Sequence, residues 1–354
     1  MDSGKNGLLI YGANGYTANL IINELLKRNI KPVLSGRNES AIKKLIEKYN
    51  LPLSYKIFNL DDEDKTVENI KEFHTLLNCA GPFKYTAEKL IEACLKANVN
   101  YLDITGEIEV LQTAFEKDKQ AKESKIVILP AIGFDVVPTD CLSKKISLTM
   151  PNAEHLMLGL LNKHGKISRG TLLTTIEVLS GNGKIRKDGI LTDSPIGEYK
   201  IKVVNEKIKF YGISIPWGDV YTSYYSTEIP NISFYLALPR ILYYSTWIIP
   251  AIKKIISNKY IKKVINSVIR KSTYGPSEKS RRKTRTIIWG RAIDESGKVY
   301  EEAYRVLEAY ELTAISAAEA VVKVLSSNIE PGVYTPSNAL GHTFMNQFIL
   351  ERII

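Results

Sequence analysis

The chain has 354 residues, 44% of them hydrophobic, so it can bury more than one core and we expect two domains. Its net charge of +10 favours anionic partners, but the basic residues lack the interleaved aromatic side chains of a nucleic-acid-binding module, which argues against nucleic acid. Three cysteines without paired spacing and four scattered histidines fit neither a disulfide framework nor a metal site, so we expect no metal.

The first third of the chain alternates apolar runs with segments of helical period. Six strands are expected, in chain order at residues 8–13, 31–36, 53–60, 75–81, 100–107 and 125–135, with helices between them. Apolar strands joined by helices form a parallel sheet that is covered on both faces. We therefore expect an α/β domain with a Rossmann-type, doubly wound parallel sheet over residues 1–150.

Longer alternating runs follow, at 154–163 and at 286–311, where a turn is expected near Gly297. They predict a second α+β domain with a mixed or antiparallel sheet, over residues 151–330. The last long helix is expected at 313–327, and Pro336 is placed to open a terminal helix. We expect the C-terminal segment 331–354 to pack back on the first domain.

The segment 234–256 is aromatic and apolar. Its run 241–252 is shorter than the about 20 residues that cross a bilayer. Two alternatives remain open: core or homodimer surface, and an interfacial membrane anchor whose Tyr and Trp lie at headgroup level. No N-terminal stretch combines a basic start, a long apolar run and a cleavage site, so we expect a cytoplasmic protein, with membrane association as the alternative.

The sequence "GANGYTA", residues 12–18, follows the first expected strand and opens a helix. Gly12 permits a tight turn, Gly15 lets a pyrophosphate approach the N–H groups of the helix end, and Ala18 lets helix and strand pack closely. We expect a dinucleotide site, and the alternative is an ordinary glycine-rich turn. The expected cofactor contacts in this loop are Gly12, Asn14, Gly15, Tyr16 and Thr17.

The second expected strand ends at Ser35-Gly36, without the carboxylate that would bind the ribose 2′-hydroxyl of NAD. Arg37 follows, and its planar fork of donors suits a 2′-phosphate, so we expect NADP(H). Asp61 either accepts from the adenine amino group or caps the next helix. Ala80, Gly81 and Pro82 end the fourth strand and keep bulk away from the cofactor ribose.

Carboxylates follow the fifth and sixth strands, where ligands bind in open α/β sheets. Asp103, grouped with Thr105 and Glu107, ends one run, and Asp135 and Asp140 follow the other. They can hold polar groups of a substrate or supply a proton, and the alternative is that they are helix caps and turn formers.

Several of these motifs together resemble the saccharopine dehydrogenase-like oxidoreductases, particularly the branch that includes the trans-acting enoyl reductases. The resemblance is carried by "NGLLIYGANGYTANL", "LSGRN", "NCAGPF", "ACLKANVNYLDITGE" and "AIGFDVVPTD", and further by "SRGTLLTTIEVL", "GPSEKSRRKTRTIIWGRA" and "EPGVYTPSNALG". It implies a nicotinamide-binding domain, a substrate domain and a site in the cleft between them. Gly12, Gly15, Arg37 and Gly81-Pro82 match its cofactor positions, and Gly133, Phe134 and Asp135 match a segment near the nicotinamide.

The branch does not carry the extended substrate domain of the lysine-pathway enzymes, so saccharopine is not expected as the substrate. We expect an NADPH-dependent reductase that transfers hydride to an electron-poor C=C or C=N of a hydrophobic acyl or isoprenoid-like small molecule. Asp135 is the first catalytic candidate, and Asp103 or Asp140 would contact the substrate. The alternative is a non-catalytic NADP-binding sensor or a membrane-peripheral interaction protein.

Overall fold

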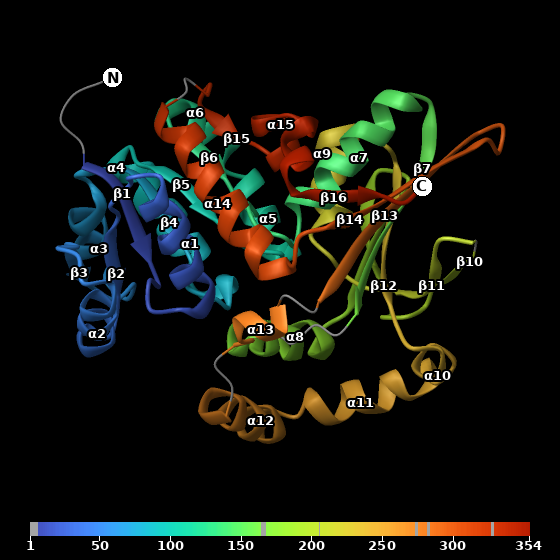
Figure 1. Cartoon of the computed structure of the whole chain (residues 1–354), viewed down its shortest axis with the longest axis horizontal. Helices are drawn as coiled ribbons and strands as arrows, with labels where there is room; N and C mark the ends of the chain where they lie inside the picture. Colours follow the sequence, from blue (N-terminus) through green and yellow to red (C-terminus); the bar gives the residue numbers. More distant parts are fainter. Residues whose placement is uncertain (1–5, 164–167, 205, 273–274, 282–283, 327–328) are drawn as a thin grey trace. The chain divides into compact units, whose positions relative to one another are not determined.

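The computed structural model describes residues 6–163, 168–204, 206–272, 275–281, 284–326 and 329–354. The chain forms two compact units (Figure 1). The first comprises Met1–Val137 and Tyr310–Leu340, and the second Pro138–Ala309 and Gly341–Ile354. The expected boundaries were residues 150 and 330, so the structure differs in where each unit begins and ends. Of the C-terminal segment, only the part up to Leu340 belongs to the first unit.

A seven-stranded parallel sheet forms the first unit, in the order β15-β6-β5-β4-β1-β2-β3. The order reverses between β1 and β4, and the edge of the sheet at this reversal is where open α/β sheets bind ligands. Six strands match the expected ones, and β15 is an addition from near the C-terminus. The bounds are β1 (Asn6–Tyr11), β2 (Val33–Gly36), β3 (Tyr55–Ile57), β4 (Phe73–Asn78), β5 (Asn100–Asp103), β6 (Val127–Leu129) and β15 (Gly332–Val333).

Helices cover both faces of this sheet because alternate strand residues point to opposite sides. Leu8 and Ile10 pack into one core with the first set of helices, and Leu9 and Tyr11 pack into the other core with the second set. The first set is α1 (Tyr16–Lys27), α2 (Glu39–Tyr49) and α14 (Ala309–Ser326), and the second is α3 (Glu63–Ile70), α4 (Ala87–Ala97), α5 (Ile108–Phe115) and α6 (Asp118–Glu123). The doubly wound fold expected from the sequence is confirmed.

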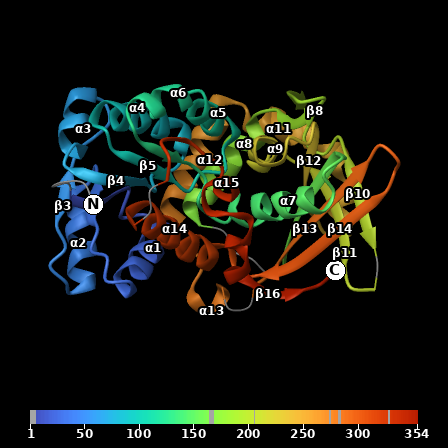
Figure 2. The same cartoon turned by 90° about the horizontal axis from the view of Figure 1, so that it is seen from above.

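The second unit is built on a mixed sheet, in the order β10-β11-β12-β7-β13-β14-β16, in which β12 and β7 are parallel and the other neighbours antiparallel. Figure 2 shows the long hairpin of β13 and β14, whose turn contains Gly297 at φ +81° as expected. The bounds are β7 (Ala153–Lys163), β8 (Gly183–Lys187), β9 (Ile190–Ser194), β10 (Lys200–Val204), β11 (Lys209–Ser214), β12 (Asn231–Ala237), β13 (Arg285–Asp294), β14 (Val299–Val306) and β16 (Ile349–Arg352).

The helices of this unit include α7, which packs closely on the sheet: a Cβ atom placed on Gly290 would lie 2.6 Å from Cδ1 of Ile146. Phe210 and Trp289 belong to one buried cluster of the sheet, with ring centroids 5.6 Å apart. The bounds are α7 (Val137–Thr149), α8 (Arg169–Ser180), α9 (Asp219–Thr227), α10 (Arg240–Tyr244), α11 (Ile249–Ile256), α12 (Lys259–Ser272) and α13 (Glu278–Arg281). The second unit also contains the 3₁₀ turns η2 (Thr246–Ile248) and η3 (His342–Phe348), and the first unit contains η1 (Phe83–Tyr85) and α15 (Pro336–Leu340), which Pro336 opens as expected.

The aromatic segment 234–256 divides between two environments. Phe234 and Tyr235 are buried in β12, but Ile241 and Trp247 are about four-fifths exposed, at 80% and 79%. The strand part of the segment is thus core, while its helical part exposes large apolar side chains, which leaves homodimer surface and membrane anchor as predictions. Among the described helices, none is long and apolar enough to cross a membrane.

Candidate cofactor site and carboxylate cluster

In the turn after β1, residue 12 has no space for a side chain, so only glycine fits. Gly12 has φ +81°, and a Cβ atom placed on it would lie 2.8 Å from the backbone N of Ala80. The N–H groups of Gly12 and Ala13 donate to the carbonyl of Ser35, and Gly15 N–H donates to Gly12 O. The turn is thus fixed by backbone contacts to the ends of β2 and β4, and it presents bare backbone at the edge of the sheet.

Helix α1 begins directly after this turn, and no side chain caps its first residues. Within the described part of the chain, the N–H groups of Asn14 and Thr17 make no hydrogen bond. Free N–H groups at the positive end of a helix bind anions such as a pyrophosphate. Asn14 is exposed beside them, and the Tyr16 ring meets the Tyr310 ring edge-on at 5.1 Å between centroids. The glycine loop and the helix end therefore fit a dinucleotide.

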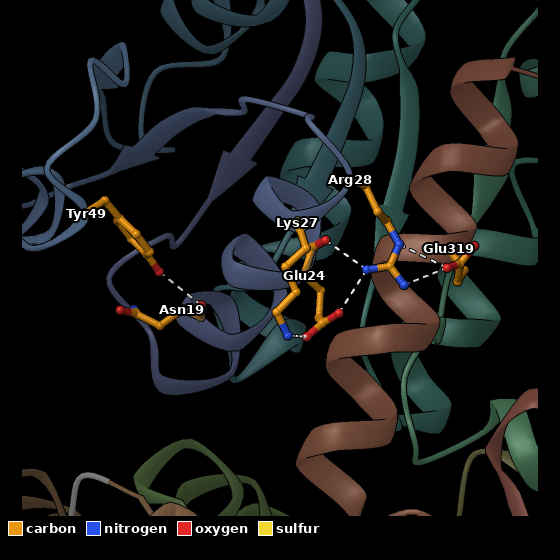
Figure 3. A network of polar contacts seen from close by, with 6 residues as sticks. All are labelled: Asn19, Glu24, Lys27, Arg28, Tyr49 and Glu319. Carbon is orange, nitrogen blue, oxygen red and sulfur yellow. Dashed lines mark hydrogen bonds and ion pairs between the residues drawn. The ribbon is translucent and has the colours of Figure 1, made fainter.

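Asn19, which was not predicted from the sequence, fixes the glycine loop through its side chain. Its side-chain amide donates to the carbonyls of Ala13, at 3.2 Å, and Gly15, at 2.7 Å. The Tyr49 hydroxyl of α2 donates to the Asn19 carbonyl at 3.0 Å (Figure 3). An asparagine in a helix carries no sequence signal for this role, because the contact depends on how the loop folds back over the helix.

A second anchor lies at the other end of α1, where Arg28 bonds Glu319 of α14 through two nitrogens at 2.9 and 2.6 Å (Figure 3). Arg28 also bonds Glu24 at 2.8 Å. Although partial burial of Arg28 acts the other way, its bonds to these carboxylates raise its pKa. The anchor therefore connects α1 to the last long helix of the chain.

Arg37 lies exposed immediately after β2. Among the described residues, its guanidinium makes no hydrogen bond or ion pair. Burial raises the pKa of Tyr11 to about 12, while the Arg37 charge lowers it and the Asp61 charge raises it, which places both charges near Tyr11. The predicted cofactor residues Arg37 and Asp61 thus share one region at the ends of β1, β2 and β3. An uncommitted guanidinium there suits a 2′-phosphate.

Asp61 does not cap α3. The cap is Asp62, whose carboxylate accepts from Lys65 N–H at 3.1 Å. Asp61 makes a long ion pair with Lys89, at 3.6 Å, and is largely exposed. The helix-cap alternative for Asp61 is therefore wrong, and its carboxylate is exposed near Tyr11, as is the predicted 2′-phosphate ligand Arg37.

The turn 80–82 after β4 is built on Asn78, which is buried and was not predicted as a site residue. Its side-chain oxygen accepts from Ala80 N–H at 3.0 Å, and its amide donates to Thr86 and Tyr101, both at 3.1 Å. Glu107 holds the next residues by accepting from the N–H groups of Phe83 and Lys84, at 2.9 and 3.0 Å. The turn containing Gly81 and Pro82 is therefore fixed from both sides.

Asp103 is fully buried at the end of β5 and its carboxylate is satisfied by the protein. It accepts from the Tyr101 hydroxyl at 2.8 Å, Thr105 N–H at 2.9 Å and Ala131 N–H at 2.8 Å. Burial raises the pKa of Asp103 to about 6, against these hydrogen bonds, which lower it. The geometry makes Asp103 a connector between β5 and the segment after β6.

That segment carries Gly133 and Phe134, and α14 fixes it. Phe134 N–H donates to the Thr313 hydroxyl at 3.0 Å, and a Cβ atom placed on Gly133 would lie 3.1 Å from Thr313 Cγ2. The Ser316 hydroxyl donates to Ile132 O at 2.8 Å. The sequence indicated this segment but not its support, which comes from residues about 180 positions later.

Asp135 follows directly and packs on the turn before α5: a Cβ atom placed on Gly106 would lie 2.9 Å from Asp135 Cβ. Its side chain keeps some accessible surface, unlike that of Asp103. Burial raises the pKa of Asp135 to about 6, and the negative charge of Glu107 raises it further. Asp135 is thus a partly accessible carboxyl group that can hold a proton near neutral pH.

Asp140 belongs to the second unit, whereas Asp103 and Asp135 belong to the first. It is fully buried in α7 and accepts from the Ser226 hydroxyl of α9 at 2.5 Å. This contact joins two helices of that unit. Among the described residues, no group of three or more His, Cys, Asp or Glu is placed to hold a metal.

Comparison with known proteins bears on this site. Residues 8–129 match the family model of the saccharopine dehydrogenase NADP-binding domain. This stretch is therefore similar to that family over the first unit's N-terminal part. The match covers β1 to β6 and the glycine loop, so the predicted family resemblance and the predicted cofactor, NADP(H), are both confirmed.

Three curated relatives illustrate the similarity. The chain is 25% identical over 153 residues to the human saccharopine dehydrogenase-like oxidoreductase, which covers 38% of this chain and 35% of that protein. It is 24% identical over 228 residues to the lipid droplet localized protein of Caenorhabditis elegans (59% and 51%) and 28% identical over 139 residues to the trans-acting enoyl reductase of Mycobacterium ulcerans (38% and 33%). The aligned part is thus a third to a half of each relative's length.

Two solved structures share the fold of nearly the whole chain. They are saccharopine dehydrogenase (L-glutamate forming) of Saccharomyces cerevisiae, at a TM-score of 0.64 and 10% identity over 98% of this chain and 99% of that one, and homospermidine synthase of Legionella pneumophila with NAD, at 0.64 and 8% over 98% and 90%. The sequence led us to expect that this chain lacks an extended substrate domain found in lysine-pathway enzymes. The first alignment covers 99% of the yeast chain and so does not show such a difference. Together the comparisons show an NADP-binding domain over residues 8–129 and a fold shared with these two structures over nearly the whole chain.

Proposed function

We propose that the protein is an NADPH-dependent reductase that transfers hydride to an electron-poor C=C or C=N of a hydrophobic acyl or isoprenoid-like substrate. The observation that carries the proposal is a largely buried but still partly accessible acid, Asp135, which follows β6 at the edge of the sheet where the glycine loop also lies. The match to an NADP-binding domain and the similarity to a trans-acting enoyl reductase support it.

The residues of the first unit fit NADP(H). Gly12 and Gly15 leave the backbone bare for the pyrophosphate, which the N–H groups of Asn14 and Thr17 would bind. Arg37 would bind the 2′-phosphate, and Tyr16, Asp61 and the turn Ala80-Gly81-Pro82 would border the adenosine and ribose groups. Gly133 and Phe134 would lie by the nicotinamide. The bound cofactor supplies the hydride.

The protein then has to deliver one proton. Hydride addition to the β-carbon of an enoyl group leaves an enolate that takes a proton at its α-carbon, and hydride addition to an imine carbon leaves a nitrogen that takes the proton. Asp135 is suited to donate it, because its raised pKa keeps a fraction of the carboxyl protonated at neutral pH. Glu107 supports this state through its negative charge.

The other two predicted acids have different roles in this proposal. Asp103 would position the chain around Asp135 by holding Thr105 and Ala131, and its fully buried carboxylate is bonded to protein groups rather than free for the substrate contact predicted from the sequence. Asp140 is occupied with Ser226 and would stabilise the second unit. A cytoplasmic location and a homodimer stay predictions.

Turnover tests the proposal. NADPH oxidation is followed by absorbance with 2-enoyl thioesters of increasing chain length, prenyl-type enoyl thioesters and cyclic imines. We expect one class to be reduced, and Asp135→Asn to lower kcat by about 100-fold or more while NADPH binding persists. Asp188→Asn, at an exposed turn of the second unit, is the matched control.

Tight NADPH binding without oxidation across the panel would instead favour the non-catalytic sensor. Equal turnover in Asp135→Asn and the parent would remove Asp135 as the proton donor.

A further inference from the structure

We propose that residues 240–272 bind the surface of a phospholipid bilayer that contains anionic lipids. This docking segment comprises α10, η2, α11 and α12, which Figure 1 draws as a row of gold and brown helices. The inference concerns the second unit alone and does not depend on the reductase activity.

Exposed apolar side chains are concentrated in the docking segment. Of twenty large hydrophobic residues that are exposed among those described, ten lie between residues 241 and 268. Tyr260, Ile241 and Trp247 are the most exposed, at 82%, 80% and 79%. The others are Leu242, Tyr244, Ile252, Ile255, Ile261, Val264 and Val268. Such a concentration on a protein surface marks an interaction site.

The exposed side chains form a stripe, and the opposite side of the helices is attached to the protein. Tyr260, Val264 and Val268 recur every fourth residue of α12, on one face of the helix. On the attached side, Lys262 pairs with Glu177 of α8 at 2.7 Å, and Lys253 of α11 donates to Asn182 at 2.6 Å. The apolar stripe is therefore held facing away from α8.

The charge of the segment identifies the partner. Residues 240–272 contain eight Lys and Arg and no Asp or Glu, in a chain whose net charge is +10. An apolar stripe with Trp and Tyr beside lysines is the composition of a helix that lies in the interface of an anionic membrane. A second copy of the chain is disfavoured as the occupant, because a two-fold interface would bring this basic surface against itself.

Vesicle flotation tests the proposal with the full chain. The probes are phosphatidylcholine vesicles with and without about one third phosphatidylserine. We expect flotation with the anionic vesicles, at least about tenfold weaker binding to the neutral ones, and loss of binding as salt rises from about 0.1 M to about 0.5 M. Ile241→Glu/Trp247→Glu should abolish flotation, and Lys254→Glu/Lys263→Glu should weaken it by about tenfold.

Matched controls carry the same changes elsewhere on the surface. Leu148→Glu/Ile190→Glu places acids at exposed apolar positions of the same unit, and Lys65→Glu/Lys119→Glu reverses two exposed lysines of the first unit. Both controls should float like the parent. Absence of flotation with anionic vesicles, or equal losses in controls and test variants, would overturn the proposal. A parent dimer by light scattering that Ile241→Glu/Trp247→Glu makes monomeric would overturn it in favour of self-association.

Discussion

The charge of Glu107 acts on Asp135: it adds to burial in raising the pKa of the Asp135 carboxyl to about 6. Glu107 is itself committed to the N–H groups of Phe83 and Lys84, so its position is fixed. The same carboxylate therefore supports the turn after β4 and the protonated state of the proposed acid.

The pH dependence of turnover follows from this relationship. Because a proton donor must be protonated, we expect kcat/KM to fall as pH rises through about 6. Glu107→Gln removes a negative charge and lowers the pKa of Asp135, so the fall should move to lower pH. Glu116→Gln, an exposed change of equal charge on the end of α5, should leave the profile in place. A profile that does not move in Glu107→Gln would contradict the coupling.

The free energy of unfolding should depend on pH through the raised pKa of Asp135. An acid whose pKa is higher in the folded than in the unfolded state binds its proton more tightly when folded, so its contribution favours folding at low pH and is lost as pH rises from about 4 to about 6. A shift from 3.8 to about 6 corresponds to about 3 kcal/mol, and the accessible part of Asp135 reduces this. Relative to the parent, Asp135→Asn should gain about 2 kcal/mol between pH 4 and pH 7 in urea unfolding.

The contrary result is a constant difference between parent and variant across this pH range. Asp188→Asn should show no such trend, because that residue lies at an exposed turn.

Cofactor preference tests Arg37. We expect the parent to bind NADPH about 100-fold more tightly than NADH, and Arg37→Asp to remove or reverse this preference, because a carboxylate repels the 2′-phosphate and accepts from a ribose hydroxyl. Fluorescence titration of both nucleotides measures it. Lys44→Asp makes a similar charge change on the exposed face of α2 and should keep the preference for NADPH. An unchanged preference in Arg37→Asp would exclude Arg37 as the 2′-phosphate ligand.

The sequence predicted the parts of this site that are encoded locally. Gly12 and Gly15 were recognisable because a tight turn between strand and helix has few solutions, and Arg37 because it occupies the place of an expected carboxylate. The six strands and the helices between them followed from the alternation of apolar and helical segments, but their order in the sheet did not.

What escaped prediction depends on contacts distant in sequence. Thr313 supports Phe134, and β15 adds two residues to the edge of the sheet beside β6, and neither contact has a local pattern. The cap of α3 is Asp62 rather than Asp61, and helix propensities do not locate the start of a helix to within one residue. The exposure of Trp247 could not be predicted either, because an apolar segment has the same sequence pattern whether it is buried in a core or exposed on a surface.

Arg28 and Glu319 should stabilise the first unit as a pair. Both side chains are partly buried and joined by two hydrogen bonds, so a double-mutant cycle of Arg28→Ala and Glu319→Ala should give a coupling of about 1 kcal/mol. The exposed pair Lys119 and Glu123, 3.9 Å apart, should give about 0.3 kcal/mol or less. Equal couplings in the two cycles, measured by urea unfolding, would show that the two hydrogen bonds from Arg28 to Oε1 of Glu319 contribute no more than an exposed ion pair.

Three glycines allow the cost of a positive φ to be measured separately from the cost of a steric clash with a neighbouring atom. Gly7 in β1 has neither a positive φ nor an atom within 4 Å of a Cβ, Gly297 has φ +81° with nothing near, and Gly12 has φ +81° with Ala80 at 2.8 Å. Substitution by Ala should therefore be nearly neutral at Gly7 and cost about 1 kcal/mol at Gly297. At Gly12 it should cost more than that, because the backbone of Ala80 has to move.

Only Gly12→Ala should also weaken NADPH binding, by about tenfold or more, since the displaced turn carries the N–H groups of the proposed pyrophosphate site. Urea unfolding and nucleotide titration on the three variants measure both effects. If Gly12→Ala loses no more stability than Gly297→Ala and binds NADPH like the parent, the close approach of Gly12 to Ala80 has no part in forming the site.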